Sequence, residues 1–254
     1  MAALTALQSF RHGQLGENKK VLILGGAGGV GSMAIQVAKA VFKPQAIATT
    51  ASTQKVERMR QLGADVVVDY KLNRFETELK DYDFALDTTG ESKQCFECVT
   101  RGGSVVTIAA TPSRKSLPKH VQGVDVSLVI GLVMNCLSFS ACHQARQAGV
   151  FYDFMFVLAN GDMMNEVREL AEQRSITPVI DQVFPFEKAN SAMEYLESGR
   201  ALGKVVVQLR RPFQSCGLKV LNKSRVRHAL TREIDNNLLT EQHKLRKFSC
   251  DRLM

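Results

Sequence analysis

Residues 21–41 read VLILGGAGGVGSMAIQVAKAV and carry the clearest structural signal in the chain. The run Val21–Leu24 is short and aliphatic, which is typical of a strand buried on both faces of a parallel sheet. The next residues, 26–31, fit the pattern G-x-G-x-x-G, and from Val30 onward apolar residues recur at helical spacing. The order of strand, glycine turn and helix predicts the first unit of a dinucleotide-binding fold.

In that context each glycine has a physical role. One allows the tight turn, one lets the backbone approach a pyrophosphate, and one lets the helix pack on the strand. The helix N-terminus would then point its free N–H groups at the phosphates. The alternative is a glycine-rich structural turn that binds nothing, because the glycine pattern alone is a weak signal.

Strand and helix patterns alternate along the rest of the chain. Further strands are predicted at Ala46–Thr50, Val66–Val68, Phe84–Leu86, Ser104–Ala109 and Phe154–Leu158. Helices are predicted at Gln54–Leu62, through Cys95–Val99, and at Met163–Glu172 with Asp162 as N-cap, and Arg101–Gly103 is expected to be a turn. This alternation predicts an α/β fold with a doubly wound parallel sheet.

Composition limits the class of protein. The 254 residues are 45% hydrophobic and 23% charged, as in an ordinary globular protein. The longest apolar run, Val126–Phe139, is too short to span a bilayer and is expected to be a buried helix, a strand pair or a subunit contact. The N-terminus lacks a secretory pattern and six cysteines do not suggest a disulfide framework, so we expect a cytoplasmic location, with an organelle matrix as the alternative.

Two motifs are weaker candidates for chemistry. Cys95 and Cys98 form a C-x-x-C, but no second pair stands at zinc spacing, so we expect inert buried thiols and keep redox or metal binding as the alternative. His143 follows the apolar run and is more typical of a surface histidine than of a catalytic acid. No metal site and no catalytic residue are therefore assigned.

Positive charge is concentrated at the C-terminus. Residues 211–254 hold ten basic and four acidic side chains, or +6 of the net +8, which leaves +2 for residues 1–210. A weakly docked or disordered extension is the favoured interpretation, and a nucleic-acid-binding tail is the alternative. Only Phe213 and Phe248 are aromatic in this extension, which argues against base stacking.

The end of the second predicted strand bears on the choice of dinucleotide. Residues 49–58 read TTASTQKVER, with no carboxylate before Glu57. A carboxylate at the strand tip would accept the ribose 2′-hydroxyl of NAD, whereas hydroxyls and Lys55 would bind the 2′-phosphate of NADP. The stretch favours NADPH, unless Lys55 and Arg58 only line a solvated helix.

Five segments together resemble the medium-chain dehydrogenase/reductase superfamily. Their order and spacing are most similar to its zinc-free quinone oxidoreductase branch, which includes zeta-crystallin-like enzymes, alkenal/enone reductases and reticulon-4-interacting-protein-like reductases. The resemblance runs from about Ala3 to Leu209. The segments are VLILGGAGGVGSMAIQVAKAVF, QLGADVVVDY, FALDTTG, RGGSVVTIA and SGRALGKVVV.

The resemblance implies NADPH-dependent reduction of a quinone or of the C=C bond of an α,β-unsaturated carbonyl, without zinc. It implies a pyrophosphate site at Gly26, Gly28, Gly29, Val30 and Gly31, and a 2′-phosphate site at Ser52, Lys55, Tyr70 and Arg200. It also implies a nicotinamide site at Thr88, Thr89, Gly90, Ile108, Ala109, Phe156 and Val157, with Thr5 nearby. Core packing is the alternative for Tyr70, Ile108 and Phe156.

The resemblance also implies a domain organisation. Relatives carry a GroES-like domain ahead of the point where this sequence begins, and we expect that domain to be absent. The expected segments are a linking helix at 1–20, a Rossmann domain at 21–176, a closing part of the catalytic domain at 177–210 and the basic extension at 211–254. A homodimer is also possible in such a protein. The alternatives are a catalytically inactive NADPH-binding module and a protein that binds nucleic acid or protein through its tail.

Overall fold

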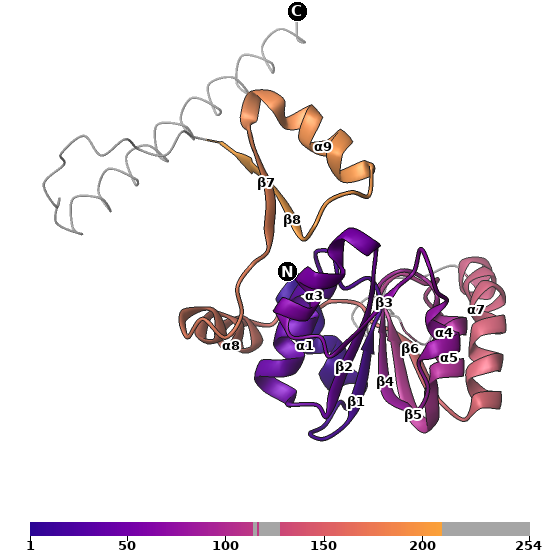
Figure 1. Ribbon diagram of the computed structural model, residues 1–254. Helices are drawn as coiled ribbons and strands as arrows, with labels where there is room; N and C mark the ends of the chain where they lie inside the picture. Colours follow the sequence, from indigo (N-terminus) through magenta and orange to yellow (C-terminus); the bar gives the residue numbers. More distant parts are fainter. Residues whose placement is uncertain (114–115, 117–127, 210–254) are drawn as a thin grey trace, which may run out of the picture. The chain divides into compact units, whose positions relative to one another are not determined.

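The computed structural model describes residues 1–113, 116 and 128–209 (Figure 1). Residues Met1–Leu209 belong to one compact unit, and residues 210–254 are outside the described part of the chain. The expectations for the basic extension therefore lie outside the described residues, as does the beginning of the apolar run at 126–139.

A parallel sheet of six strands forms the centre of the first unit. Its order is β3-β2-β1-β4-β5-β6, and every neighbouring pair is parallel, which confirms the predicted doubly wound sheet. The sheet reverses its direction of growth between β1 and β4, where open α/β sheets bind ligands. The strands are β1 Lys20–Ile23, β2 Ala46–Ala51, β3 Val66–Asp69, β4 Tyr82–Asp87, β5 Val99–Thr107 and β6 Phe151–Phe154.

Helices cover both faces of this sheet (Figure 1). Val21 and Ile23 of β1 belong to one core cluster, whereas Leu22 and Leu24 belong to the other, so the alternation along one buried strand supplies both cores. The helices are α1 Ala2–His12, α2 Gly31–Val37 with a π-helical continuation Ala38–Phe42, α3 Val56–Leu62 after the 3-10 turn Thr53–Lys55, α4 Phe75–Glu78, α5 Ser92–Cys98, α7 Leu128–Ala148 and α8 Gly161–Glu172.

The last described segment forms a second, two-stranded parallel sheet. Strands β7 Ile180–Pro185 and β8 Lys204–Gln208 are connected through the 3-10 turn Phe186–Lys188 and α9 Ala189–Glu197. The Gly203 N–H donates a hydrogen bond of 2.9 Å to the Ala27 carbonyl in the glycine loop. The closing segment therefore contacts the first strand–helix unit directly.

Three local predictions were wrong. Arg101–Gly103 lies inside β5, where the register shifts opposite β4 and Gly102 has a φ of +84°, because a strand can absorb extra residues as a bulge. Strand β6 ends at Phe154, where the sequence predicts a strand to begin. The N-cap of α8 is Asn160 and not Asp162, since the Asn160 side chain accepts a 2.9 Å hydrogen bond from the Met163 N–H.

The apolar run near residue 130 forms α7, but part of it is not buried. Leu132, Leu137 and Phe139 are each 65% exposed. Of the three alternatives for this run, the strand pair is wrong, a buried helix does not fit these side chains, and the subunit contact stays a prediction. Within the described ranges, none of the helices combines the length and apolar character needed to cross a bilayer.

Candidate functional site

A cleft of about 470 Å³ opens where β1 to β4 end. The carboxyl ends of parallel strands meet at one edge of the sheet, so four chain segments converge there. Part of the closing segment completes the wall. The lining residues are Gly25, Ala27, Gly28, Thr50, Ala51, Ser52, Lys55, Tyr70, Phe75, Thr88, Thr89, Glu91, Gly199 and Ala201.

The glycine loop is shaped by close backbone approaches. Gly25 has a φ of +65°, in the left-handed region that favours glycine. A Cβ atom at Gly31, the first residue of α2, would overlap the Gly25 carbonyl oxygen and lie 2.7 Å from the Cα atom of Gly26. The helix can therefore begin this close to the strand only because residue 31 has no side chain.

Threonine hydroxyls hold this loop to the neighbouring strands. The Thr50 hydroxyl accepts a 3.0 Å hydrogen bond from the Gly25 N–H, and the Thr50 carbonyl accepts one from Gly26 at 3.0 Å. On the other side, the Thr88 hydroxyl donates to the Leu24 carbonyl at 2.8 Å. The loop is thus fixed from β2 and from β4 before any ligand binds.

A single buried carboxylate, Asp87, organises the next loops. Its Oδ1 accepts hydrogen bonds from the N–H groups of residues 89, 90 and 91 at 3.0, 2.8 and 3.1 Å. Its Oδ2 accepts from the Thr107 hydroxyl at 3.0 Å, and Thr107 in turn accepts from the Ala109 N–H at 3.3 Å. The loops after β4 and β5, which carry the residues expected around a nicotinamide, are therefore held together.

Three of the four residues predicted for the 2′-phosphate line the same cleft, and Arg200 does not. Ser52, Lys55 and Tyr70 line the cleft together. The Lys55 ammonium donates a 2.9 Å hydrogen bond to the Ala201 carbonyl. Burial lowers the pKa of Lys55, and the charge of Asp181 partly opposes this shift. The side chain is thus a partly desolvated cation in a cleft that Ser52 and Tyr70 also line.

The other predicted site residues differ in their placement. Phe156 packs edge to face against Phe154, with ring centroids 4.8 Å apart, and Val157 and Ile108 pack against the core. The cleft is lined by the predicted residues Gly28, Ser52, Lys55, Tyr70, Thr88 and Thr89. The predicted residues outside its lining are Gly26, Gly29, Val30, Gly31, Gly90, Ile108, Ala109, Phe156, Val157 and Arg200. Their cofactor contacts stay predictions.

Three residues near the cleft were not found from sequence. Phe75 and Glu91 line it, although both lie beyond the motifs that suggested the site. The ammonium of Lys204 lies beside the glycine loop, only 2.5 Å from where a Cβ atom of Gly29 would stand. The only sequence signal for Lys204 is its place after a glycine at the start of a strand, in SGRALGKVVV.

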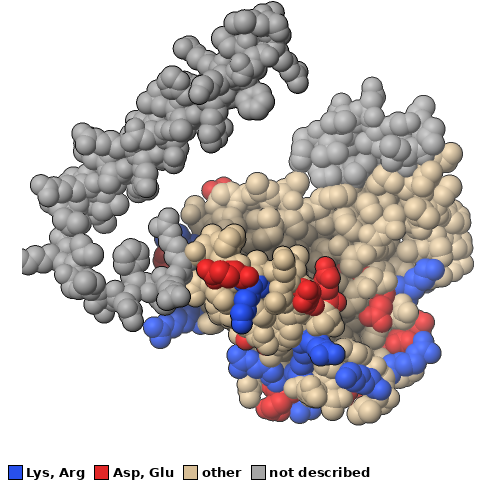
Figure 2. Space-filling view, turned by 90° about the horizontal axis from the view of Figure 1, so that it is seen from above, with Lys and Arg blue, Asp and Glu red and all other residues tan. Residues whose placement is uncertain are grey.

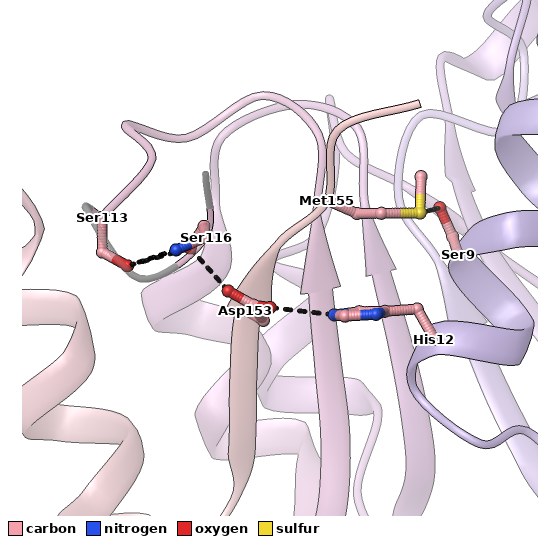
Figure 3. A network of polar contacts seen from close by, with 6 residues as sticks. All are labelled: Ser9, His12, Ser113, Ser116, Asp153 and Met155. Atoms are coloured by element: carbon pink, nitrogen blue, oxygen red, sulfur yellow. Dashed lines mark hydrogen bonds and ion pairs between the residues drawn. The ribbon is translucent and has the colours of Figure 1, made fainter. Parts of the chain in front are cut away.

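A separate polar network joins α1 to β6 (Figure 3). His12 Nε2 lies 2.9 Å from one oxygen of Asp153, and the Ser116 hydroxyl donates to the other oxygen at 2.6 Å. The Ser9 hydroxyl lies 3.5 Å from the sulfur of Met155. None of these residues lines the cleft, so the network positions the first helix against the sheet edge.

The alternatives for cysteine and histidine chemistry gain no support. Cys95 and Cys98 are buried, and burial raises the pKa of Cys98 to about 11 and that of Cys95 well above its usual range. His143 stacks on Phe139, with ring centroids 5.8 Å apart. Within the ranges that the structure covers, no group of three or more His, Cys, Asp or Glu side chains is arranged to hold a metal ion.

Charge on the described surface is mixed. Figure 2 shows Lys and Arg interspersed with Asp and Glu on the face it presents, and residues 1–210 carry a net charge of only +2. A basic patch that would follow a nucleic-acid backbone is therefore not visible on this face.

Comparisons with known proteins agree with this arrangement. The 2-methylene-furan-3-one reductase of Solanum lycopersicum is 34% identical over 212 residues, which cover 82% of this chain and 45% of that protein. The chloroplastic NADPH-dependent alkenal/one oxidoreductase of Arabidopsis thaliana is 32% identical with the same coverage. The solved quinone oxidoreductase from Coxiella burnetii is 25% identical, with a TM-score of 0.67 over 83% of this chain and 59% of that one.

The chain spans about half the length of the curated relatives it matches. Residues 62–207, more than half of its own length, match the family described as zinc-binding dehydrogenase. Strands β3 to β7 and all but the last residue of β8 lie within the matched residues, and the glycine loop and strands β1 and β2 precede them. The chain therefore belongs to the zinc-binding dehydrogenase family, in the zeta-crystallin-like quinone oxidoreductase branch of the medium-chain dehydrogenase/reductase superfamily.

Proposed function

We propose that this protein is an NADPH-dependent reductase that acts on a quinone or on the C=C bond of an α,β-unsaturated carbonyl. The observation that carries the proposal is the cleft at the sheet reversal, which joins the glycine loop to Ser52, Lys55 and Tyr70. The names of the plant relatives, an alkenal/one oxidoreductase and a furanone reductase, support the substrate class. Residues 21–176 would form the cofactor domain and 177–210 its closing segment.

The residues of the cleft fit a phosphorylated dinucleotide. The glycine loop and the start of α2 would hold the pyrophosphate, and Lys204 adds a positive charge beside Gly29. Lys55, Ser52 and Tyr70 would surround the 2′-phosphate. An acidic side chain in their place would repel this phosphate. None of residues 50–55, where β2 ends, is acidic. The absence of a carboxylate there favours NADPH over NADH.

The nicotinamide end would lie against the loop after β5, which Asp87 holds through Thr107. Residues 108–109 would wall the ring, and Phe156 and Val157 would approach its carboxamide. Thr88 and Thr89 line the cleft together with Lys55 and would lie beside the adenosine half. When bound, NADPH supplies the hydride, and the chain contributes orientation and the exclusion of water. No side chain is assigned as the proton donor, so solvent is the proposed source of the proton.

An NADPH titration followed by cofactor fluorescence, with NADH in parallel, tests the proposal. Tighter binding of NADPH, followed by its oxidation when an enone or a quinone is added, is the expected result. Binding without oxidation of any such substrate would instead identify an inactive NADPH-binding module. Absence of binding would overturn the assignment of the cleft, and salt-sensitive RNA binding that is lost on deletion of residues 211–254 would favour the tail as the functional part.

We also propose a homodimer formed along β6 and α7. Strand β6 is an edge of the sheet, Phe151 on it is 47% exposed, and Leu132, Leu137 and Phe139 of α7 expose apolar surface. Light scattering should give twice the chain mass, and Leu137→Asp should lower it. We propose a cytoplasmic location, with an organelle matrix as the other outcome of subcellular fractionation.

A further inference from the structure

The cleft holds two charged side chains of opposite sign, Lys55 and Glu91. Lys55 follows β2 and Glu91 follows β4, and these strands flank β1 in the sheet. The two strands are two spacings apart, about 10 Å. The charges therefore enter the cleft from opposite sides of the glycine loop.

A carboxylate is an unfavourable neighbour for a dinucleotide that carries several negative charges. Glu91 would weaken ligand binding if its carboxylate faced a phosphate. It does not weaken binding if the carboxylate faces a hydrogen-bond donor of the ligand. The phosphates of NADPH are accounted for by the glycine loop and by Lys55. The donors left on the adenosine half are the ribose 3′-hydroxyl and the amino group of the base.

Glu91 is held in position but keeps acceptor capacity. Its backbone N–H donates to Asp87 at 3.1 Å, and its Oε2 accepts a 2.7 Å hydrogen bond from the Thr89 hydroxyl. No lysine or arginine of the described chain forms an ion pair with it. When Glu91 is ionised, its other oxygen, Oε1, can accept hydrogen bonds from further donors.

Two aromatic residues line the same cleft. Phe75 lines it and is only 4% exposed, so its ring is part of the core and presents a limited apolar surface to the cleft. Tyr70, at the end of β3, lines the same region. A flat purine ring is stabilised by stacking on an aromatic side chain, whereas a ribose hydroxyl gains nothing from such a contact. The aromatic lining therefore favours the base as the neighbour of Glu91.

We propose that Glu91 reads the base of the cofactor by accepting a hydrogen bond from the exocyclic amino group of adenine, while Phe75 supports the ring. The inference rests on the proposed function, since it assigns a specificity residue within the same cleft. Adenine presents an amino donor at this position, whereas hypoxanthine presents a carbonyl acceptor, which a carboxylate repels. Glu91 thereby selects adenine.

The test compares NADPH with its hypoxanthine analogue, reduced nicotinamide hypoxanthine dinucleotide phosphate, by fluorescence titration. The wild-type protein should bind NADPH roughly tenfold more tightly, as expected for one charge-assisted hydrogen bond. In Glu91→Gln the two affinities should agree within about twofold, because an amide both accepts and donates. Glu97→Gln removes an exposed carboxylate from α5, the helix that begins directly after Glu91, and should keep the wild-type ratio.

The outcomes separate this inference from the proposed function. Equal affinities in the wild-type protein, or an unchanged ratio in Glu91→Gln, would overturn the role of Glu91 and leave NADPH binding intact. Binding of neither nucleotide by the wild-type protein would overturn both. Unfolding curves of each variant show whether a change in ratio reflects loss of folding, and Glu91→Ala should also lose the preference for adenine.

Discussion

The ammonium group of Lys55 donates a hydrogen bond of 2.9 Å to the carbonyl oxygen of Ala201. This bond joins the end of β2 to the segment before β8, and both residues line the cleft. In the proposed complex the same ammonium would face the 2′-phosphate. The proposed 2′-phosphate contact and the bond to the closing segment would therefore use the same ammonium group.

Replacement of Lys55 by Met should weaken NADPH binding by about 10- to 100-fold, the range expected for a hydrogen bond between charged groups. NADH lacks the 2′-phosphate, so its affinity should change little. Parallel titrations measure both. Arg58→Met is the control, because Arg58 contacts Gln61 on the exposed side of α3 and does not line the cleft; an equal loss in both variants would contradict the role of Lys55.

The same lysine gives a pH dependence. Burial lowers the pKa of Lys55 from its ordinary value of 10.5, so the cation neutralises earlier as pH rises. NADPH affinity should therefore decline at alkaline pH before ordinary lysines titrate, and NADH affinity should decline less. A bound phosphate opposes this shift, because it favours the charged form. Titrations across the alkaline range would show the difference between the two cofactors.

Lys204 should behave differently from Lys55. Its ammonium lies beside Gly29, in the loop assigned to the pyrophosphate, which NADH and NADPH share. Lys204→Met should weaken both cofactors by a similar factor, about tenfold. Isothermal titration of the two cofactors would check this, with Lys188→Met in the turn before α9 as the control. A loss confined to NADPH would place Lys204 at the 2′-phosphate instead.

Gly31→Ala should destabilise the fold and abolish cofactor binding. The new methyl group would overlap the Gly25 carbonyl, so the turn must shift, at a cost of about 1–3 kcal/mol. Urea unfolding measures the stability. Gly161→Ala in α8 is the matched control, since a Cβ atom there meets no atom within 4 Å. Equal stabilities of the two variants would contradict the close approach at Gly31.

Asp87→Asn should loosen the loops after β4 and β5. The carboxylate of Asp87 now accepts hydrogen bonds from backbone N–H groups and from the Thr107 hydroxyl. In the variant, the amide N–H groups would face some of these donors, and we expect a loss of about 1–3 kcal/mol in stability. Cofactor affinity should fall as well, because these loops would contact the two ends of the proposed cofactor. Hydrogen exchange of residues 88–91 would report the loosening. Asp162→Asn, on the exposed first turn of α8, should show neither effect.

The thiols should differ in their reactivity. Cys136 is exposed, whereas Cys95 and Cys98 are buried, with a pKa of about 11 for Cys98. Iodoacetamide near neutral pH should therefore label Cys136 in the native protein, and Cys95 and Cys98 only after unfolding. Peptide mass spectrometry distinguishes the sites. Rapid labelling of Cys95 in the folded protein would revive the redox interpretation of the C-x-x-C.

The glycine loop and the central strands were predictable because their signals are local. A buried parallel strand must be apolar throughout, and Gly31 is required by a contact with residues close in sequence. Lys204 and Glu91 were not predictable, since their approach to the cleft depends on how β4 and β8 pack. The same limit applies to α7: its apolar sequence was compatible with a buried helix or a subunit contact, and only the structure shows that Leu137 is exposed.

The hydrogen bond from Gly203 to Ala27 has a consequence for synthesis of the chain. All six strands of the large sheet precede Gly203 in sequence, so they leave the ribosome first. A nascent chain that has reached only α9 can pair these strands, but its glycine loop still lacks the amide that closes on Ala27. The glycine-loop end of the cleft is therefore the last part of the cleft to be completed, after translation has passed β8.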